Sequence, residues 1–250
     1  GAAVISKTDH TTVCYVVDIS IQKELERRKD DFLSLASHEL KTPVANLKLK
    51  LELLMAEMKG TTHLIWHDEL AQMDLQIDRL TRLINDILNL SRLENNKMVY
   101  RYQYFDCNAW VRTVVKTQRP LARGHEIKVR GHVRSLVDGD PERLSQVLNN
   151  LLSNAFKYSP PTKPVVVTLG QRGKKVIITV RYYGPGIAKA EQKKIFDRFY
   201  QITGPNRQAV TGLGIGHFIS REIVRAHQGE LTGNRHPGHG ATFILSLPIT

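Results

Sequence analysis

Apolar residues recur at alternating four- and three-residue steps through the first third of the chain, which predicts two long amphipathic helices. Gly60 separates them. We expect helices of about 35 and 30 residues that form an antiparallel hairpin. One hairpin cannot bury both apolar seams, so two copies should associate as a four-helix bundle. The seams are Leu33, Ser37, Leu40, Val44, Leu47, Leu51, Leu54 and Met58, then Leu70, Met73, Ile77, Leu80, Ile84 and Ile87.

The segments on either side of this hairpin have a different pattern. Residues 12–17 are mostly β-branched or aromatic and predict a strand, which resembles the closing strand of a PAS sensor domain. Charged residues at 22–31 then lead into the first helix. We therefore assign residues 1–21 to the end of an upstream sensor domain and its connector, 22–95 to the hairpin, and 96–250 to a second domain.

In the second domain, short strands alternate with helices. Strands are expected at residues 100–105, 126–133, 165–171, 174–182, 230–234 and 241–247, and helices from 106 to about 123, at 141–157 and at 214–227. Asp106 is expected to cap the first of these helices. The pattern predicts an α+β sandwich with helices over one face of a mixed sheet.

Composition fits this division. With 250 residues and 41% hydrophobic content, the chain is long enough for two domains with their own cores. The sequence contains no run of about 18 apolar residues and no secretory signal pattern at its start. We expect a cytoplasmic fragment, or the cytosolic part of a larger membrane-attached sensor. The fragment itself is expected to make no contact with a membrane.

The charge is strongly basic, with a formal net charge of +12. Residues 95–135 hold nine Lys and Arg against only Asp106 and Glu126. These bases are scattered through an alternating pattern without an interleaved aromatic platform or a known DNA-reading motif. We therefore expect no nucleic-acid binding, and we favour a solvated basic face or docking to an acidic partner.

His38 lies off the seam of the first helix, on the side that faces water. Glu39 is adjacent and could polarise one imidazole nitrogen, which leaves the other free to attack phosphorus. Thr42 is one turn further along the same face and could position a water. Pro43 is expected to bend the helix and expose His38. The pattern His-Glu-x-x-Thr-Pro on a heptad helix predicts a phosphoacceptor histidine.

Asn150 and Asn154 lie one turn apart on one helix face, although asparagine is a mediocre helix former. Amide oxygens suit Mg²⁺, which prefers oxygen ligands and bridges phosphates. Lys157 adds a positive charge for phosphate, and Tyr158 adds a flat face for a base. The alternative interpretation is a pair of surface amides without a function.

Two glycine-rich turns follow the asparagine helix. Gly184 and Gly186 come directly after a strand, and glycines allow backbone amides to approach phosphates. The intervening segment at 196–211 suits a mobile lid over a nucleotide. The second turn precedes a helix and contains Gly212, Gly214 and Gly216.

Together these motifs resemble those of the sensor histidine kinases of two-component systems, over roughly residues 22–250. The resemblance implies a dimeric hairpin followed by an ATP-binding domain of the type shared with gyrase and Hsp90. It also implies phosphorylation of His38 with ATP and Mg²⁺ as cofactors, and transfer to an aspartate of a response-regulator receiver domain. Glu39 would act as the base, and Thr42 would help to dephosphorylate the regulator.

The same resemblance implies roles at the nucleotide. Asn154 would be the Mg²⁺ ligand, while Asn150 and Lys157 would contact the phosphates. Tyr158 would pack on the adenine, and Thr242 would assist adenine recognition from the last strand. The segments at 184–186, 195–200 and 212–216 correspond to the first glycine box, the phenylalanine box and the second glycine box of the family.

Tyr182 departs from the family pattern, which has an aspartate at this position to accept a hydrogen bond from the adenine amino group. Loss of a hydrogen bond to a charged group costs about 1.5–3 kcal/mol, and the bulky ring could enter the space of the base. We expect impaired ATP binding. Two alternatives are a remodelled pocket that still accepts the nucleotide, and a pseudokinase scaffold or phosphatase that does not use ATP.

Overall fold

The computed structural model describes residues 2–8, 11–57, 66–95, 97–122, 124–202, 213–236 and 240–249. The chain divides into two compact units. The first unit is mainly helical and comprises Gly1–Ile84 with Thr211–Leu213, and the second is an α+β unit that comprises Asn85–Val210 and Gly214–Thr250. A helical region followed by an α+β sandwich is the predicted fold class, which is confirmed.

The chain begins with a β-hairpin. Strand β1 (Ala2–Thr8) pairs antiparallel with β2 (Thr11–Val17), with Ala2 opposite Val17. The strand predicted at 12–17 corresponds to β2. Strand β1 was not predicted, because its sequence AAVISKT has no clear alternation and contains two alanines, which are depleted in strands. The proposed relation of this segment to a PAS domain stays a prediction.

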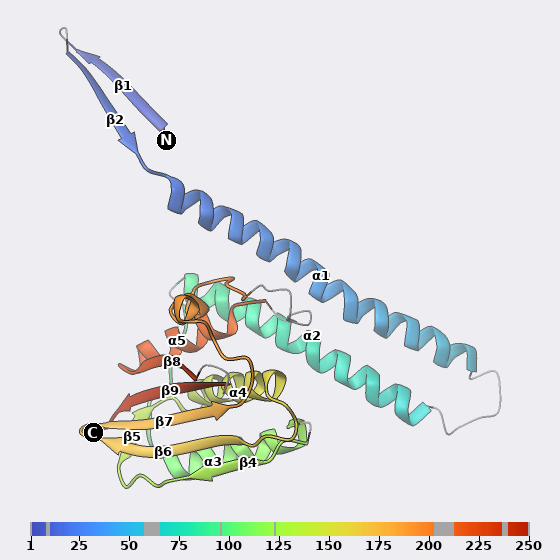
Figure 1. The fold of residues 1–250 in the computed structure, drawn as a ribbon. Coiled ribbons are helices and arrows are strands. Elements are labelled where there is room, and N and C mark those ends of the chain that lie inside the picture. Colours follow the sequence, from blue (N-terminus) through green and yellow to red (C-terminus); the bar gives the residue numbers. More distant parts are fainter. Residues whose placement is uncertain are drawn as a thin grey trace. The chain divides into compact units, whose positions relative to one another are not determined.

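Two long helices follow, α1 (Ser20–Glu57) and α2 (Trp66–Glu94). They run antiparallel (Figure 1), and Lys50 Nζ donates to Gln72 Oε1 across the pair at 2.7 Å. Asp18 Oδ1 accepts the Ser20 N–H at the start of α1. Helix α1 continues through Pro43 as one element.

The apolar seams of these two helices are largely exposed in the single chain. Five large seam side chains are between 49% and 56% exposed: Val44, Leu51, Leu70, Ile77 and Ile84. The side chains of Leu33, Leu54 and Met58 lie outside the described residues. An exposed apolar stripe of this length is typical of an interface, which agrees with the expected association of two copies.

The α+β unit is built on a five-stranded sheet. Its order is β4-β6-β7-β9-β8, with β4 parallel to β6 and every other pair antiparallel. The strands are β4 (Ile127–Arg130), β6 (Val165–Arg172), β7 (Lys175–Tyr182), β8 (Glu230–His236) and β9 (Gly240–Pro248). A separate pair is formed by β3 (Gln103–Asp106) and β5 (Leu136–Gly139).

Three helices accompany the sheet, α3 (Cys107–Gln118), α4 (Pro141–Tyr158) and α5 (Gly216–Ala226), together with 3₁₀ turns η1 (Arg119–Leu121), η2 (Lys189–Glu191) and η3 (Lys194–Phe196). Side chains alternate along each strand. In β7, Val176, Ile178, Val180 and Tyr182 are buried on the face that the helices cover, and the residues between them point to the other face. This other face, which we call the helix-free face, therefore presents a different set of side chains from the buried face.

Several boundaries differ from the prediction. Helix α3 ends at Gln118 and tightens into η1, because Pro120 cannot donate a backbone hydrogen bond. Strand β4 stops at Arg130, since the next residue, Gly131, has φ +82° and lies against the carbonyl of Leu169. Strand β5 was not predicted, because four residues give too short a pattern. Asp106 caps α3 as predicted.

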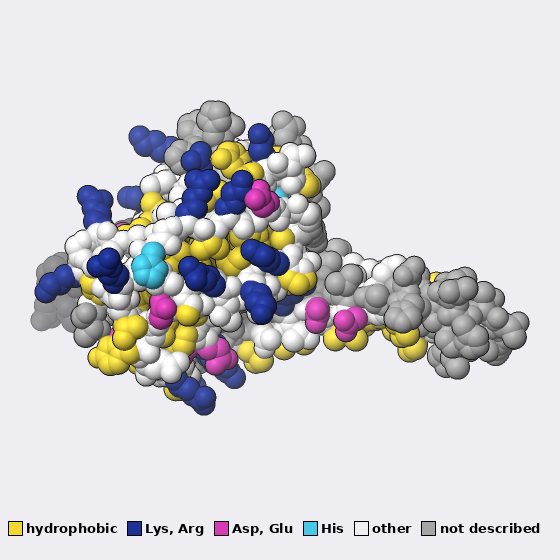
Figure 2. Space-filling view, turned by 90° about the horizontal axis from the view of Figure 1, so that it is seen from below, with side chains coloured by type: hydrophobic (Ala, Val, Ile, Leu, Met, Phe, Trp, Pro, Cys, Tyr) yellow, Lys and Arg dark blue, Asp and Glu magenta, His cyan; other side chains and the backbone are white. Residues whose placement is uncertain are grey.

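The basic surface is visible in Figure 2, where Lys and Arg side chains are spread over the face shown with few Asp and Glu among them. Within the part of the chain that the structure describes, no helix has an apolar stretch long enough to span a bilayer.

We expect the chain to be a dimer in solution, because the seams expose too much apolar surface for a stable monomer. Light scattering should give twice the monomer mass of 28.4 kDa. Ile77→Asp places a charge in the seam and should produce monomers, whereas Asn85→Asp adds the same charge at an exposed position away from the seam and should leave the dimer intact. A monomeric unmodified chain at micromolar concentration would contradict the bundle.

Candidate functional site

Helix α4 carries the two predicted asparagines, and its start is fixed by Asp140. One carboxylate oxygen of Asp140 accepts the N–H groups of Glu142 and Arg143 at 3.0 Å, and the other accepts that of Arg101 at 2.8 Å. Burial alone would raise the pKa of Asp140, but these three hydrogen bonds outweigh it and hold the pKa below its usual value. The cap therefore sets which residues of α4 face the sheet.

The apolar stripe of α4 is fully buried, and the two asparagines lie half-buried beside it. Asn150 Nδ2 donates to Ser220 Oγ at 3.0 Å. Asn154 Nδ2 donates to Asn150 Oδ1 and approaches His217 Nε2, both at 3.4 Å. Both contacts use the nitrogen of the Asn154 amide, and within the described residues its carbonyl oxygen accepts no hydrogen bond. That oxygen is accessible to a cation.

Gly216 allows the start of α5 to pack against α4. A Cβ at Gly216 would lie 2.6 Å from Asn150 Oδ1 and 3.2 Å from Asn150 Cγ. Any larger residue would have to displace the amide that holds Asn154. Close packing therefore explains why a glycine stands at position 216. It also brings the N-terminus of α5 close to the asparagine pair.

The remaining predicted glycines also occupy restricted positions. A Cβ at Gly184 would lie 2.3 Å from the carbonyl oxygen of Tyr158, so the loop after β7 passes directly against the end of α4. Gly186 and Gly214 have φ of +70° and +69°, which other residues rarely adopt. Gly212 lies outside the described residues, as do residues 203–211 of the predicted lid.

An aromatic cluster, defined here as Tyr182, Phe196, His217 and Phe243, fills the space between the sheet and these loops. The Tyr182 ring is 5% exposed and stacks on Phe243 with a centroid distance of 6.4 Å. The His217 ring stacks on the same Phe243 at 4.8 Å, and Phe196 contacts both His217 and Phe243 edge-on. Packing thus connects Tyr182 through Phe243 and His217 to Asn154.

Burial lowers the pKa of His217 to about 4, so its imidazole is neutral near pH 7. The amide nitrogen of Asn154 is a donor, so Nε2 of His217 acts as the acceptor and the ring proton is assigned to Nδ1. His217 was not among the predicted site residues. Its only sequence signal is its place directly after Gly216, where the glycine turn becomes a helix.

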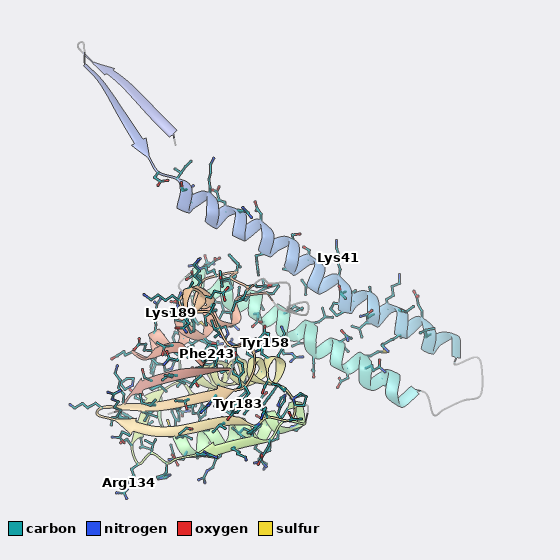
Figure 3. All side chains as sticks on the ribbon, viewed as in Figure 1. Lys41, Arg134, Tyr158, Tyr183, Lys189 and Phe243 are labelled. Atoms are coloured by element: carbon teal, nitrogen blue, oxygen red, sulfur yellow. The ribbon has the colours of Figure 1, made fainter. Side chains whose placement is uncertain are left out.

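Lys157 and Tyr158 lie at the end of α4. The ammonium of Lys157 is 5.2 Å from the centroid of the half-buried Tyr158 ring. Tyr158 is adjacent to Gly184 through its carbonyl, and Figure 3 shows it near the end of the sheet that also carries Phe243 and Tyr183. The structure therefore brings together Asn150, Asn154, Lys157, Tyr158, Tyr182, Gly184 and Gly216.

Thr242 is not brought together with them. In the register of β7 and β9, Tyr182 pairs with Ala241, and Thr242 pairs with Arg181. Because side chains alternate across a strand, Thr242 belongs to the helix-free face, where it lines a hollow with Arg181 and Tyr183. This position does not support the predicted role of Thr242 in adenine recognition.

The predicted residues of the hairpin all lie in α1. Thr42 is exposed, and it lies one helical turn beyond His38. The side chains of His38 and Glu39 are outside the described residues. Their predicted roles stay predictions.

Comparison with protein families gives two matches. Residues 139–250 match the family described as histidine kinase-, DNA gyrase B-, and HSP90-like ATPase. Residues 28–96 match the His Kinase A (phospho-acceptor) domain. The chain is 29% identical over 259 residues to the sensor protein kinase WalK of Staphylococcus aureus, covering 99% of this chain and 60% of that protein.

The WalK of Staphylococcus saprophyticus is also 29% identical, over 258 residues that make up 41% of its length. The chain thus spans about half the length of these curated relatives. Among solved structures, full-length ShkA in complex with AMPPNP has a TM-score of 0.64 at 27% identity, covering 88% of this chain and 46% of that one. The Acinetobacter baumannii histidine kinase AdeS has a TM-score of 0.62 at 24% identity, covering 85% and 98%, and shows the shared fold.

The close approach of the first glycine turn to α4 can be tested with two matched substitutions. Gly184→Ala places a Cβ against a backbone carbonyl and should destabilise the chain by about 1–3 kcal/mol. Gly170→Ala on β6 meets no atom within 4 Å and should be neutral or stabilise by up to about 1 kcal/mol. Thermal or urea unfolding measures both, and equal effects would mean that the contact with Tyr158 is not tight.

Proposed function

The chain belongs to the sensor histidine kinases, and we propose that it is the catalytic core of a two-component sensor. It phosphorylates His38 with ATP and transfers the phosphoryl group to an aspartate of a response regulator. The observation that carries this proposal is the presence, in one chain, of a phosphoacceptor domain at 28–96 and an ATPase domain at 139–250. Because its relatives are longer, we propose that it is the cytosolic part of a larger sensor.

In this proposal a nitrogen of His38 attacks the terminal phosphorus of ATP, and ADP leaves. Glu39 takes up the proton that the imidazole loses, which keeps the attacking nitrogen nucleophilic. Thr42 positions the water that removes the phosphoryl group from the regulator. The three residues share one stretch of α1, where residues one turn apart face the same side.

The ATPase domain binds ATP, and we assign its metal and phosphate contacts to α4 and the glycine turns. Asn154 offers its carbonyl oxygen to Mg²⁺, since its nitrogen is already engaged. The metal neutralises phosphate charge when bound. Asn150 holds the Asn154 amide and lies near the phosphates with Lys157, while the Tyr158 ring packs on the adenine. Backbone amides of the turns at Gly184, Gly186, Gly212 and Gly214 complete the phosphate contacts.

Tyr182 distinguishes this chain within the proposal. It occupies the position at which the family presents a carboxylate to the adenine amino group. Its ring is buried and stacked on Phe243, so the side chain adds bulk to the packed side of the sheet and supplies no charge. We therefore propose that ATP binding is weakened. The same observation favours the second candidate, a dimeric scaffold that dephosphorylates a regulator without using ATP.

If the chain accepts a phosphoryl group, His38 should carry it as an acid-labile, base-stable phosphoramidate. His38→Gln should abolish the label obtained with radioactive ATP, because the amide side chain is not nucleophilic. His63→Gln, at another histidine of the chain, should retain it. A label that persists in His38→Gln, or that resists acid, would place the acceptor elsewhere.

Tyr182→Asp should tighten ATP binding by at least about tenfold, because a charge-assisted hydrogen bond is regained and the ring is removed. Discrimination against GTP should improve, since guanine presents an acceptor oxygen that a carboxylate repels. Phosphorylation of His38 should rise in parallel, and dephosphorylation of a partner regulator should change little.

Titration calorimetry and a phosphorylation assay measure these effects. The matched control is Tyr183→Asp, which introduces the same group one residue later, on the opposite face of the sheet, and should not improve ATP binding. If both variants behave alike, or if Tyr182→Asp binds ATP no better than the unmodified chain, Tyr182 is accommodated and ATP binding is not impaired by it.

A further inference from the structure

The helix-free face of the five-stranded sheet has a hollow of about 370 Å³, which we call the basic hollow. Four strands contribute to it: β4, β6, β7 and β9. Its lining is Lys128, Arg130, Pro164, Val166, Thr168, Thr179, Arg181, Tyr183 and Thr242. A volume of this size lies within the range of small-molecule sites.

The strand register arranges the polar residues of the hollow in rows. Lys128 pairs with Val166, Val166 with Arg181, and Arg181 with Thr242. Neighbouring strands are about 4.8 Å apart, so the backbones of Lys128 and Arg181 are roughly 10 Å apart across Val166. Both side chains are long enough to reach one anion placed between them.

The adjacent row adds a third cation and two hydroxyls. Arg130 pairs with Thr168, and Thr168 pairs with Thr179. Arginine and lysine supply charge, and threonine hydroxyls donate directed hydrogen bonds to the same oxygens. Two rows of this kind present donors at several points across the hollow, which suits a ligand with more than one anionic group.

The lining of the hollow contains three cations and no carboxylate. Within the described residues, neither Arg130 nor Arg181 forms an ion pair, and Lys128 is paired with Glu126 at 3.1 Å in a largely exposed contact. Such exposed pairs contribute little and exchange readily. The Arg181 guanidinium lies 5.4 Å from the Tyr183 ring centroid, which also has Lys163 at 5.9 Å. This cation–π contact with Tyr183 restrains Arg181, and the N–H groups of its guanidinium can still donate to an anion.

Thr242 supplies a separate observation. Its Oγ1 is buried, and no hydrogen bond to it is formed among the described residues. A buried hydroxyl without a partner is unfavourable, and such groups are rare in folded proteins. Rotation about χ1 would turn this hydroxyl toward the hollow, where a ligand oxygen would become its partner beside Arg181 of the same row.

We propose that the basic hollow is a binding site for a small anion that carries at least two phosphate groups. Tetrahedral phosphate oxygens match guanidinium, ammonium and hydroxyl donors. Two linked phosphates offer several such oxygens, which the long Lys and Arg side chains of both rows can contact. The site is separate from the nucleotide site, because Tyr182 and Arg181 are consecutive residues on opposite faces of β7. The proposal does not depend on kinase activity.

The test is calorimetric titration of the full chain with inorganic pyrophosphate, at low salt and without Mg²⁺. Pyrophosphate should bind, and Arg181→Gln and Lys128→Gln should each weaken binding by about tenfold. Arg134→Gln removes the same charge from an exposed position that lies well away from Tyr183 in Figure 3 and should have an effect below about twofold. Citrate should bind more weakly than pyrophosphate.

Four results would overturn the proposal. No detectable binding of pyrophosphate at millimolar concentration would remove the site. Equal weakening by all three substitutions would show that only net charge matters, and citrate binding as tightly would remove the preference for phosphate. If instead Asn154→Ala weakens pyrophosphate binding and Arg181→Gln does not, the anion occupies the nucleotide site.

Discussion

The packing of the sheet against α4 and α5 is the constraint on which the rest of this domain depends. The same side of β7 and β9 supplies a buried core and, in the proposed function, borders the nucleotide. Phe243 stacks with both Tyr182 and His217, and His217 contacts Asn154. A change in the volume of one ring should therefore shift the position of Asn154, the residue proposed to hold the metal, because closely packed interiors transmit such changes.

This constraint explains why the glycines occupy their positions. Gly216 meets the Asn150 amide, and Gly184 meets the carbonyl of Tyr158, so each turn approaches α4 as closely as its backbone allows. The side chains of α4 are in turn oriented by the Asp140 cap. The cap fixes the start of α4, the start fixes which residues of the helix face the loops, and the asparagine pair and the loops packed on it depend on that orientation.

Much of this domain could be predicted from local patterns, and the failures have physical reasons. Helix α4 and strands β6 and β7 follow clear periodicities, and their bounds agree closely with the prediction. The face on which Thr242 lies could not be predicted, because adjacent strand residues face opposite ways and a shift of one position changes the face. His217 was missed because its role arises from contacts with Phe196, Phe243 and Asn154, which are distant in sequence.

The central claim is the proposal that Tyr182 weakens nucleotide binding, and direct titration of the unmodified chain with ATP, with and without Mg²⁺, tests it most directly. The expected result is a dissociation constant of roughly 10–100 μM or weaker that still improves when Mg²⁺ is present, because the loss of one charge-assisted hydrogen bond shifts a micromolar affinity by about one to two orders of magnitude. Low-micromolar binding by the chain with Tyr182 in place would contradict the account.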